Sequence, residues 1–412
     1  MEQTKGFRTI TYRFRIYSEH EAWFWETKKI YNRVLEFYYD ILTREQGLTE
    51  LNKQKVMRHL EILSIGTKNG EEPKYPVPFE KVPLYFRRAA INDAVRLYRS
   101  FDSGKGHGAK PAGNIDSAPT FYKGMYKEFC STSVMLKLFN GSNWEWVSCS
   151  IDICGRVFPK TKQILSPTLV LTGNRAMLHV PVKEEVLDVR PVKERLDNNE
   201  KICAVYLPNS DTMAAMVVLD IEGKLLASRF IHGGRELAHR KSVYIKRIEE
   251  NRKSMGGNKE KLPAEENKAL KEKIHRITDN IAHKVSREII DFCKEQGASI
   301  LVVPNYKQSM DFNRIGYVTA TNYDWLGRRI ISYVKYKSFG EGIVTATAST
   351  KNIASRCYQC GEPVKKYNEG YRPGKNFYGG KNFVCPNGHQ GSTYFNSAMN
   401  VGRNFLRYMS EK

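Results

Sequence analysis

The sequence predicts a multidomain protein of the α+β class. Its 412 residues are enough for two to four domains. In the first half, alternating apolar and polar residues, which are typical of strands, recur on both sides of a long stretch with helical periodicity. In the second half, continuous apolar runs of strand length alternate with long helical stretches. A cysteine pair near the end indicates a metal-binding segment.

The composition favours a polyanionic partner. The formal net charge is +22, and 11% of the residues are aromatic. A soluble basic protein with solvated lysine faces is the plainer interpretation, but aromatic rings among basic residues can stack on bases, which favours nucleic acid. No apolar run is long enough to span a membrane, and the N-terminal MEQTKGFRT has no apolar region of a secretory signal, so no membrane partner is expected. Eight cysteines, five without pairing spacing, fit a reducing cytoplasm.

The first sixty residues predict a strand followed by two helices. Residues 9–17 alternate between apolar and polar side chains, which predicts a half-buried strand. Helical periodicity begins at His20 and predicts one long helix that ends near Gly47. Thr49 is expected to cap the next helix.

A third helix carries the first candidate nucleic-acid contacts. Glycine, proline and charged residues over 66–78 predict a loop, and residues 85–101 return to core spacing at helical period. Arg87 and Arg88 lie on this helix. They are expected either to form a solvated face or to contact phosphates.

The pattern becomes β after a glycine-rich segment, residues 103–117, which is expected to be flexible. Residues 133–138 and 144–149 alternate and predict two strands. The stretch 169–180 predicts a hairpin that turns on Gly173 and Asn174. On pattern alone, an α+β domain of unknown role would explain this half of the chain equally well.

The second half begins with apolar strands and a basic helix. Residues 202–219 are apolar with one polar interruption, residues 220–223 predict a turn, and residues 224–231 predict a third strand. A basic helix then starts at Gly233. Its candidate nucleic-acid contacts are Arg235, Arg240, Lys241, Lys246, Arg247 and Arg252. A solvated amphipathic helix is the alternative, but basic residues dominate its polar face.

The next elements alternate helix and strand. Residues 251–263 are expected to be mobile, and a long helix is predicted over 264–296. Its His283 is more easily explained as a packing residue than as a ligand. Gly297 ends the helix, and residues 299–306 predict a buried strand. A further helix over 325–337 and a strand over 342–346 lead to the cysteine segment.

Four residues near the C-terminus have the spacing of a metal site. Cys357 and Cys360 form a C-x-x-C pair, and Cys385 and His389 follow at a distance that allows one zinc ion to bind all four. One structural zinc ion is therefore expected. The alternative is a segment that has lost its metal.

The segment after this pattern carries a family resemblance. Tyr394 to Asn400, YFNSAMN, resembles the D-x-N-A-A-x-N motif that ends the RuvC-type nuclease core of TnpB proteins and of the miniature type V CRISPR effectors related to them. Asn396, Ala398 and Asn400 match the motif, whereas Tyr394 stands in place of its metal-binding Asp. The segments PLYFRRAAI, FYKGMYK and HKVSREII also resemble this family. In its usual form, the family carries a second C-x-x-C where this chain has CPNGH.

The resemblance implies an oligonucleotide-binding-like wedge β-barrel with a helical recognition insertion, and an RNase H-like (RuvC) domain with an inserted zinc ribbon. It also implies that the basic helix from Gly233 lies along a guide–target duplex. The implied domains are residues 1–19 (first strand of the wedge barrel), 20–117 (helical recognition lobe), 118–198 (remainder of the barrel), 199–348 (RuvC-like domain), 349–392 (zinc ribbon that binds target nucleic acid) and 393–412 (RuvC-like C-terminal segment).

The resemblance also implies that the metal-binding acids of the nuclease active site are absent from this sequence. By alignment with the family motifs, Tyr206 and Pro304 occupy the other two acid positions, so Tyr206, Pro304 and Tyr394 replace all three carboxylates. Two phenols and a proline cannot hold two Mg²⁺ ions, which require hard, charged oxygen ligands, so no catalytic magnesium is expected. A slipped register that uses Asp211, Asp220 or Asp311 remains the alternative.

These observations imply an RNA-guided, sequence-specific protein that binds double-stranded DNA without cleaving it and represses transcription by promoter occlusion. Its expected partners are a guide RNA and target DNA with a short flanking motif, and either a homodimer or a recruited transcription protein is possible. The expected location is the prokaryotic cytoplasm, on the nucleoid when DNA is bound. Three alternatives remain open: an active endonuclease with displaced acids, a nuclease-dead effector that recruits a partner for transcription activation or transposition, and a plain RNA-binding protein.

Overall fold

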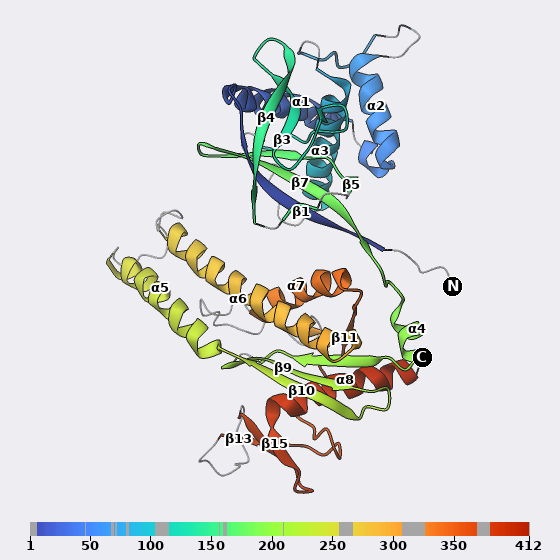
Figure 1. Cartoon of the computed structure of the whole chain (residues 1–412), viewed down its shortest axis with the longest axis vertical. Coiled ribbons are helices and arrows are strands. Elements are labelled where there is room, and N and C mark those ends of the chain that lie inside the picture. The colour runs from blue at the N-terminus through green and yellow to red at the C-terminus, as the bar shows by residue number, and fades with distance from the viewer. Residues whose placement is uncertain are drawn as a thin grey trace. The chain divides into compact units, whose positions relative to one another are not determined.

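The computed structural model describes residues 6–45, 47–66, 70, 72–79, 82–103, 115–155, 157–159, 163–208, 210–254, 267–306, 326–368 and 380–411, with the side chains of 49, 102, 103 and 252 left aside. The chain forms two compact units (Figure 1). The N-terminal unit is Phe7–Glu185, and the C-terminal unit combines Met1–Gly6 with Val186–Lys412. No helix in the described part of the chain has the length and apolar content to cross a membrane.

The N-terminal unit packs helices against one large sheet. Its helical elements are α1 (Ala22–Arg44), the short η1 (Leu48–Glu50), α2 (Lys53–Ile65) and α3 (Leu84–Ser103). Its strands are β1 (Gly6–Tyr17), β2 (Tyr126–Lys127), β3 (Ser133–Phe139), β4 (Trp144–Cys154), β5 (Gln163–Ile164), β6 (Thr168–Thr172) and β7 (Arg175–Val186). Within the described residues the sheet order is β2-β3-β4-β1-β7-β5, and β6 also pairs with β7.

The alternation predicted for the first strand is confirmed, and it explains the core of this unit. Tyr12, Phe14 and Ile16 of β1 are buried, whereas Arg13 and Arg15 between them are exposed. Apolar side chains on one face of a strand can be buried only if helices or loops cover that face. The predicted hairpin is also confirmed, because β6 and β7 pair antiparallel up to Thr172 and Arg175.

One helix boundary differs from the prediction. The cap of α2 is Asn52, whose Oδ1 accepts a hydrogen bond from the Lys55 backbone N–H at 3.0 Å, and not Thr49, which lies in η1. Both residue types cap helices well, so sequence pattern could not choose between them. The long helix α1 ends at Arg44, slightly before Gly47, which adopts a left-handed φ of 86° in the following turn.

The C-terminal unit contains a second sheet with helices on both faces. Its strands are β8 (Lys201–Tyr206), β9 (Thr212–Leu219), β10 (Leu225–His232), β11 (Ala298–Pro304) and β12 (Val344–Ala348). Its helices are α4 (Val192–Asp197), α5 (Gly234–Ser254), α6 (Lys268–Glu295), α7 (Leu326–Gly340) and α8 (Thr393–Ser410). The order is β10-β9-β8-β11-β12; β10, β9 and β8 are antiparallel neighbours, and β11 runs parallel to both β8 and β12.

Alternate residues of the central strands contact different layers. Cys203 and Val205 pack in the core that includes α6 and α7, whereas Ile202 and Ala204 pack against α8 on the other face (Figure 1). A strand buried on both faces needs apolar residues at every position, which explains the continuous apolar run. Gly402 allows α8 to lie close to the sheet, because a Cβ there would meet a methyl carbon of Leu219 at 2.6 Å.

The segments on either side of α6 agree only in part with the sequence prediction. The prediction of a mobile segment over 251–263 is wrong for residues 251–254, which continue α5; residues 255–266 lie outside the described part. The helix predicted over 264–296 is confirmed as α6, and Gly297 follows it with a left-handed φ of 66°. Asp311 also lies outside the described residues.

Candidate metal centre and sheet edge

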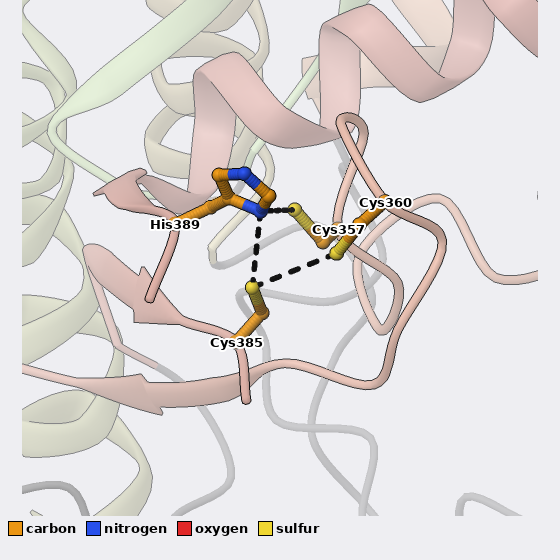
Figure 2. Close-up of side chains that lie close together, drawn as sticks. All are labelled: Cys357, Cys360, Cys385 and His389. Atoms are coloured by element: carbon orange, nitrogen blue, oxygen red, sulfur yellow. Dashed lines mark hydrogen bonds between the residues drawn. The ribbon is translucent and has the colours of Figure 1, made fainter. Parts of the chain in front are cut away.

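The four predicted metal ligands come together beside a small three-stranded sheet. The strands β13 (Lys365–Tyr367), β14 (Asn382–Val384) and β15 (Gln390–Ser392) pair antiparallel in that order. One ligand atom from each of Cys357, Cys360, Cys385 and His389 lies within 4.8 Å of the others (Figure 2). The cluster could therefore hold a metal ion such as zinc.

Two tight turns bring these ligands together. The Gly361 backbone N–H donates to the Cys357 carbonyl at 2.9 Å, and the Gly388 N–H donates to the Cys385 carbonyl at 3.0 Å. Both glycines have left-handed φ angles, 78° and 79°, which residues with a Cβ rarely adopt. The second turn is closed by Gly388, so the fourth ligand follows it at His389.

The distances within the cluster fit tetrahedral zinc. Zn–S bonds of about 2.3 Å and Zn–N bonds of about 2.0 Å at the tetrahedral angle place two sulfurs about 3.8 Å apart and a sulfur and nitrogen about 3.5 Å apart. The Cys360 and Cys385 sulfurs are 3.7 Å apart, and His389 Nδ1 lies 3.3 Å from the Cys385 sulfur and 3.8 Å from the Cys357 sulfur (Figure 2). Hydrogen bonds, of which the one from the Glu362 backbone contributes most, lower the pKa of the Cys360 thiol to about 6. A low pKa favours the thiolate, which is the form that binds metals.

Two asparagines join this centre to α8, and sequence reasoning did not assign them this role. Asn396 donates to the Arg356 carbonyl at 2.8 Å and accepts from the Tyr358 backbone N–H at 2.9 Å. Asn400 donates to the carbonyls of Ile353 and Arg356 at 2.9 and 2.8 Å. Both asparagines are buried. They satisfy backbone groups that would otherwise be buried without partners, so they fix the first cysteine turn on the helix.

The three positions predicted to replace metal-binding acids lie on elements that share an edge of the five-stranded sheet. Because β8 and β11 are parallel and Ala204 pairs with Val302, their last residues, Tyr206 and Pro304, lie at the same edge. Tyr394 lies in the first turn of α8, and its ring stacks near that of Tyr206, with centroids 6.4 Å apart and planes 27° apart.

This edge is aromatic and poorly solvated. Burial raises the pKa of the Tyr206 phenol above its usual value, and the nearby Tyr394 adds to the shift. Burial also raises the pKa of Tyr306, whose hydroxyl donates to the Leu207 carbonyl at 3.4 Å. Both phenols are therefore neutral at pH 7. Tyr306 was not singled out as a site residue from the sequence.

The two described alternative acids have structural roles. The Asp220 carboxylate accepts the backbone N–H groups of Glu222 and Lys224 at 3.1 and 2.8 Å in the turn between β9 and β10. In the β8–β9 pairing, Ile202 lies opposite Leu219, the residue before Asp220, so this turn is at the other end of β8 from Tyr206. Asp211 lies nearer the tyrosines, but its carboxylate accepts the Arg235 backbone N–H at 3.2 Å at the start of α5.

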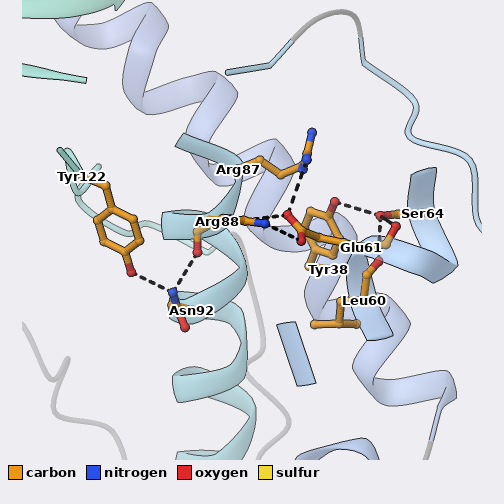
Figure 3. A network of polar contacts seen from close by, with 8 residues as sticks. All are labelled: Tyr38, Leu60, Glu61, Ser64, Arg87, Arg88, Asn92 and Tyr122. Atoms are coloured by element: carbon orange, nitrogen blue, oxygen red, sulfur yellow. Dashed lines mark hydrogen bonds and ion pairs between the residues drawn. The ribbon is translucent and has the colours of Figure 1, made fainter. Parts of the chain in front are cut away.

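The arginines predicted on the third helix bind an acidic partner within the protein. Arg88 makes two hydrogen bonds to the Glu61 carboxylate, at 2.9 and 3.0 Å, and Arg87 contacts the same group at 3.5 Å (Figure 3). Next to them, the hydroxyls of Tyr38 and Ser64 lie 3.0 Å apart (Figure 3). Phosphate contacts by Arg87 and Arg88 stay a prediction, and they would compete with this ion pair.

The basic residues predicted on α5 are spread along its length. The side chains of Arg235, Arg240, Lys246 and Arg247 are exposed, and Lys241 is half-buried; the side chain of Arg252 lies outside the described set. Arg240 has a weak ion pair with Glu236 at 3.8 Å. On α6, His283 stacks flat on Tyr333, with ring centroids 4.0 Å apart, as expected of a packing residue.

We compared the chain with protein-family models, with curated protein sequences and with solved structures. Residues 8–140 match the model of the Aq_aa04 family. No curated protein matches the chain in sequence. The structure is similar to that of Cas12f1 in a complex with sgRNA and target DNA: the TM-score is 0.55 and the identity 14%, over 92% of this chain and 81% of that chain. It is also similar to the mini-RNA-guided endonuclease CRISPR-Cas phi3, with a TM-score of 0.50 and 10% identity over 98% and 92% of the two chains. The chain thus has a mixed α+β fold similar to that of compact type V CRISPR effectors.

Proposed function

We propose that this protein binds DNA under the direction of a guide RNA, does not cleave it, and represses transcription by occupying promoters. The observation that carries the proposal is the packing of Tyr206 near Tyr394 at the shared sheet edge, in a fold similar to that of RNA-guided effectors. The solved relatives are complexes with guide RNA and target DNA, or an RNA-guided endonuclease, which supports the same partners here.

The sheet edge is chemically unsuited to two-metal catalysis. Mg²⁺ is held by charged oxygen ligands in near-octahedral geometry, and a pair of such ions must be balanced by several carboxylates. Neutral phenols at Tyr206 and Tyr306 do not supply that charge, and Pro304 has no side-chain oxygen. The hydrogen bonds of Asp211 and Asp220 argue against a displaced set of acids. Without a metal to activate water, a bound strand stays intact.

The remaining features support binding. A net charge of +22 attracts nucleic acid, and the exposed cations of α5 supply a basic face. In RNA-guided recognition, base pairing reads the sequence while the protein holds the heteroduplex by its shape and backbone charge.

We assign the N-terminal unit to the wedge and recognition roles, and the C-terminal unit to a RuvC-like domain with a zinc ribbon formed around Cys357, Cys360, Cys385 and His389. There, zinc would supply only a structural crosslink. A complex that stays on a promoter excludes RNA polymerase.

The test is a mobility shift with the RNA that co-purifies with the protein. That RNA is sequenced, and a DNA duplex that matches its guide segment, with a randomised flank, is compared with a scrambled duplex. We expect a shift of the matched duplex only. We expect Lys246→Gln with Arg247→Gln to reduce the slope of log affinity against log salt by about 2, since each lost phosphate contact removes about 0.9. Equal binding of matched and scrambled DNA would contradict the proposal.

A further inference from the structure

A polar groove lies on the C-terminal unit, between the second half of α8 and the first cysteine turn. Its volume is about 810 Å³. One wall is α8 from Asn400 onward together with Glu411, which follows the helix. The other wall combines Ser349–Asn352, which follows β12, with the turn at Arg356–Gly361. The asparagine bonds from α8 to the Arg356 carbonyl hold these two walls together.

The groove is strongly basic. Its lining includes Lys351, Arg356, Arg403 and Arg407, against the single acid Glu411. Among the residues that the structure describes, no carboxylate forms an ion pair with any of these four cations. Two of them are held by carbonyls instead: Arg356 donates to the Gly361 carbonyl at 3.1 Å, and Arg403 donates to the carbonyls of Tyr358 and Gly223. A carbonyl orients a guanidinium without cancelling its charge, so the groove retains an affinity for anions.

The other lining groups suit bases. The ring of Tyr408 is 51% exposed, and the amides of Gln359 and Asn404 can both donate and accept hydrogen bonds. A single strand presents its phosphates, base faces and base edges together, whereas a duplex hides its base faces. We propose that this groove binds single-stranded nucleic acid, with phosphates on the four cations and a base stacked on Tyr408.

The groove is separate from the sheet edge that carries Tyr394. Arg407 follows Tyr394 by thirteen residues on the same helix, which corresponds to about 20 Å at 1.5 Å per residue. Arg403 contacts Gly223, in the turn at the other end of β8 from Tyr206. The inference rests on the proposed function only in taking nucleic acid as the partner, because neither the groove nor its test requires a guide.

The test uses the full-length protein without guide RNA. Two fluorescent single-stranded probes are used: an oligothymidylate that contains 4-thiothymidine and an oligouridylate that contains 4-thiouridine. The protein is titrated into each probe, and binding is followed by fluorescence anisotropy. The complexes are then irradiated, and the crosslinked residues are mapped by mass spectrometry. We expect crosslinks in residues 404–411, and the DNA and RNA probes then tell which strand binds more tightly. Lys351→Gln with Arg407→Gln, both exposed, is expected to weaken binding about tenfold in low salt.

The matched control is Lys284→Gln with Lys335→Gln, exposed residues of α6 and α7 on the opposite face of the sheet, which is expected to change the affinity less than about twofold. Equal losses in the two double variants, crosslinks confined to other segments, or tighter binding of duplex than of single strands would each overturn the inference. Failure of guided DNA binding with groove crosslinks intact would refute the proposed function alone.

Discussion

Replacing Cys385 with serine is expected to remove bound zinc and unfold the three-stranded sheet around it. The buried cluster of this segment consists of Cys357, Phe383 and Cys385, so two of its three members are predicted metal ligands. A segment with so small an apolar core depends on its metal for stability, and structural zinc sites in small peptides bind with about 10–16 kcal/mol. A serine hydroxyl is a poor substitute for a thiolate, so the variant loses most of that energy.

Zinc content by mass spectrometry and hydrogen exchange over residues 357–368 and 380–392 measure this effect. We expect one zinc per chain and slow exchange in the unmodified protein, and no zinc and fast exchange in the variant. Cys154→Ser is the matched control, because Cys154 is exposed and lies in β4, outside the cluster. Its zinc content should be unchanged. Unmodified protein without zinc, or Cys385→Ser that retains it, would contradict the assignment.

Introducing Asp at both Tyr206 and Tyr394 is expected to destabilise the C-terminal unit and to make its stability depend on Mg²⁺. Both rings pack against the buried cluster between the sheet and α8, so their loss costs about 3 kcal/mol or more. Two carboxylates at neighbouring ring positions also repel each other when no cation is bound. Magnesium at 100 times its dissociation constant would return about 2.7 kcal/mol.

Thermal unfolding in EDTA and in millimolar Mg²⁺ distinguishes the outcomes. The unmodified protein and the control Tyr206→Phe with Tyr394→Phe, which keeps both rings, should unfold at temperatures that do not depend on Mg²⁺. The double Asp variant should unfold earlier in EDTA and recover partly in Mg²⁺. A Mg²⁺-dependent rise in the unmodified protein that disappears in Asp211→Asn would show that a displaced acid holds the metal.

Local patterns were sufficient for most elements and for the metal cluster. The alternation in β1 and the double-sided apolar run of β8 and β9 follow from how each strand is covered, and the four metal ligands follow from their spacing. These features depend on near neighbours or on one strong chemical preference, so a single sequence reveals them.

Long-range contacts were not predictable in the same way. Glu61 precedes Arg88 by 27 residues, and Asn396 follows Arg356 by 40; no periodicity links such residues before the chain folds. The Asn pair was recognised as a family motif, but its role in holding the first cysteine turn appears only from the hydrogen bonds. The basic groove likewise combines residues from both sides of the cysteine segment.

The most direct test of a binding protein without nuclease activity is a cleavage assay on the matched complex itself. End-labelled target duplex is bound by the guide-loaded protein, its occupancy is followed by mobility shift, and both strands are then resolved on denaturing gels after incubation with Mg²⁺ or Mn²⁺. We predict that both strands stay full length for as long as the complex persists. Cut strands whose yield depends on the guide match, and which are absent with Asp211→Asn, would contradict the account.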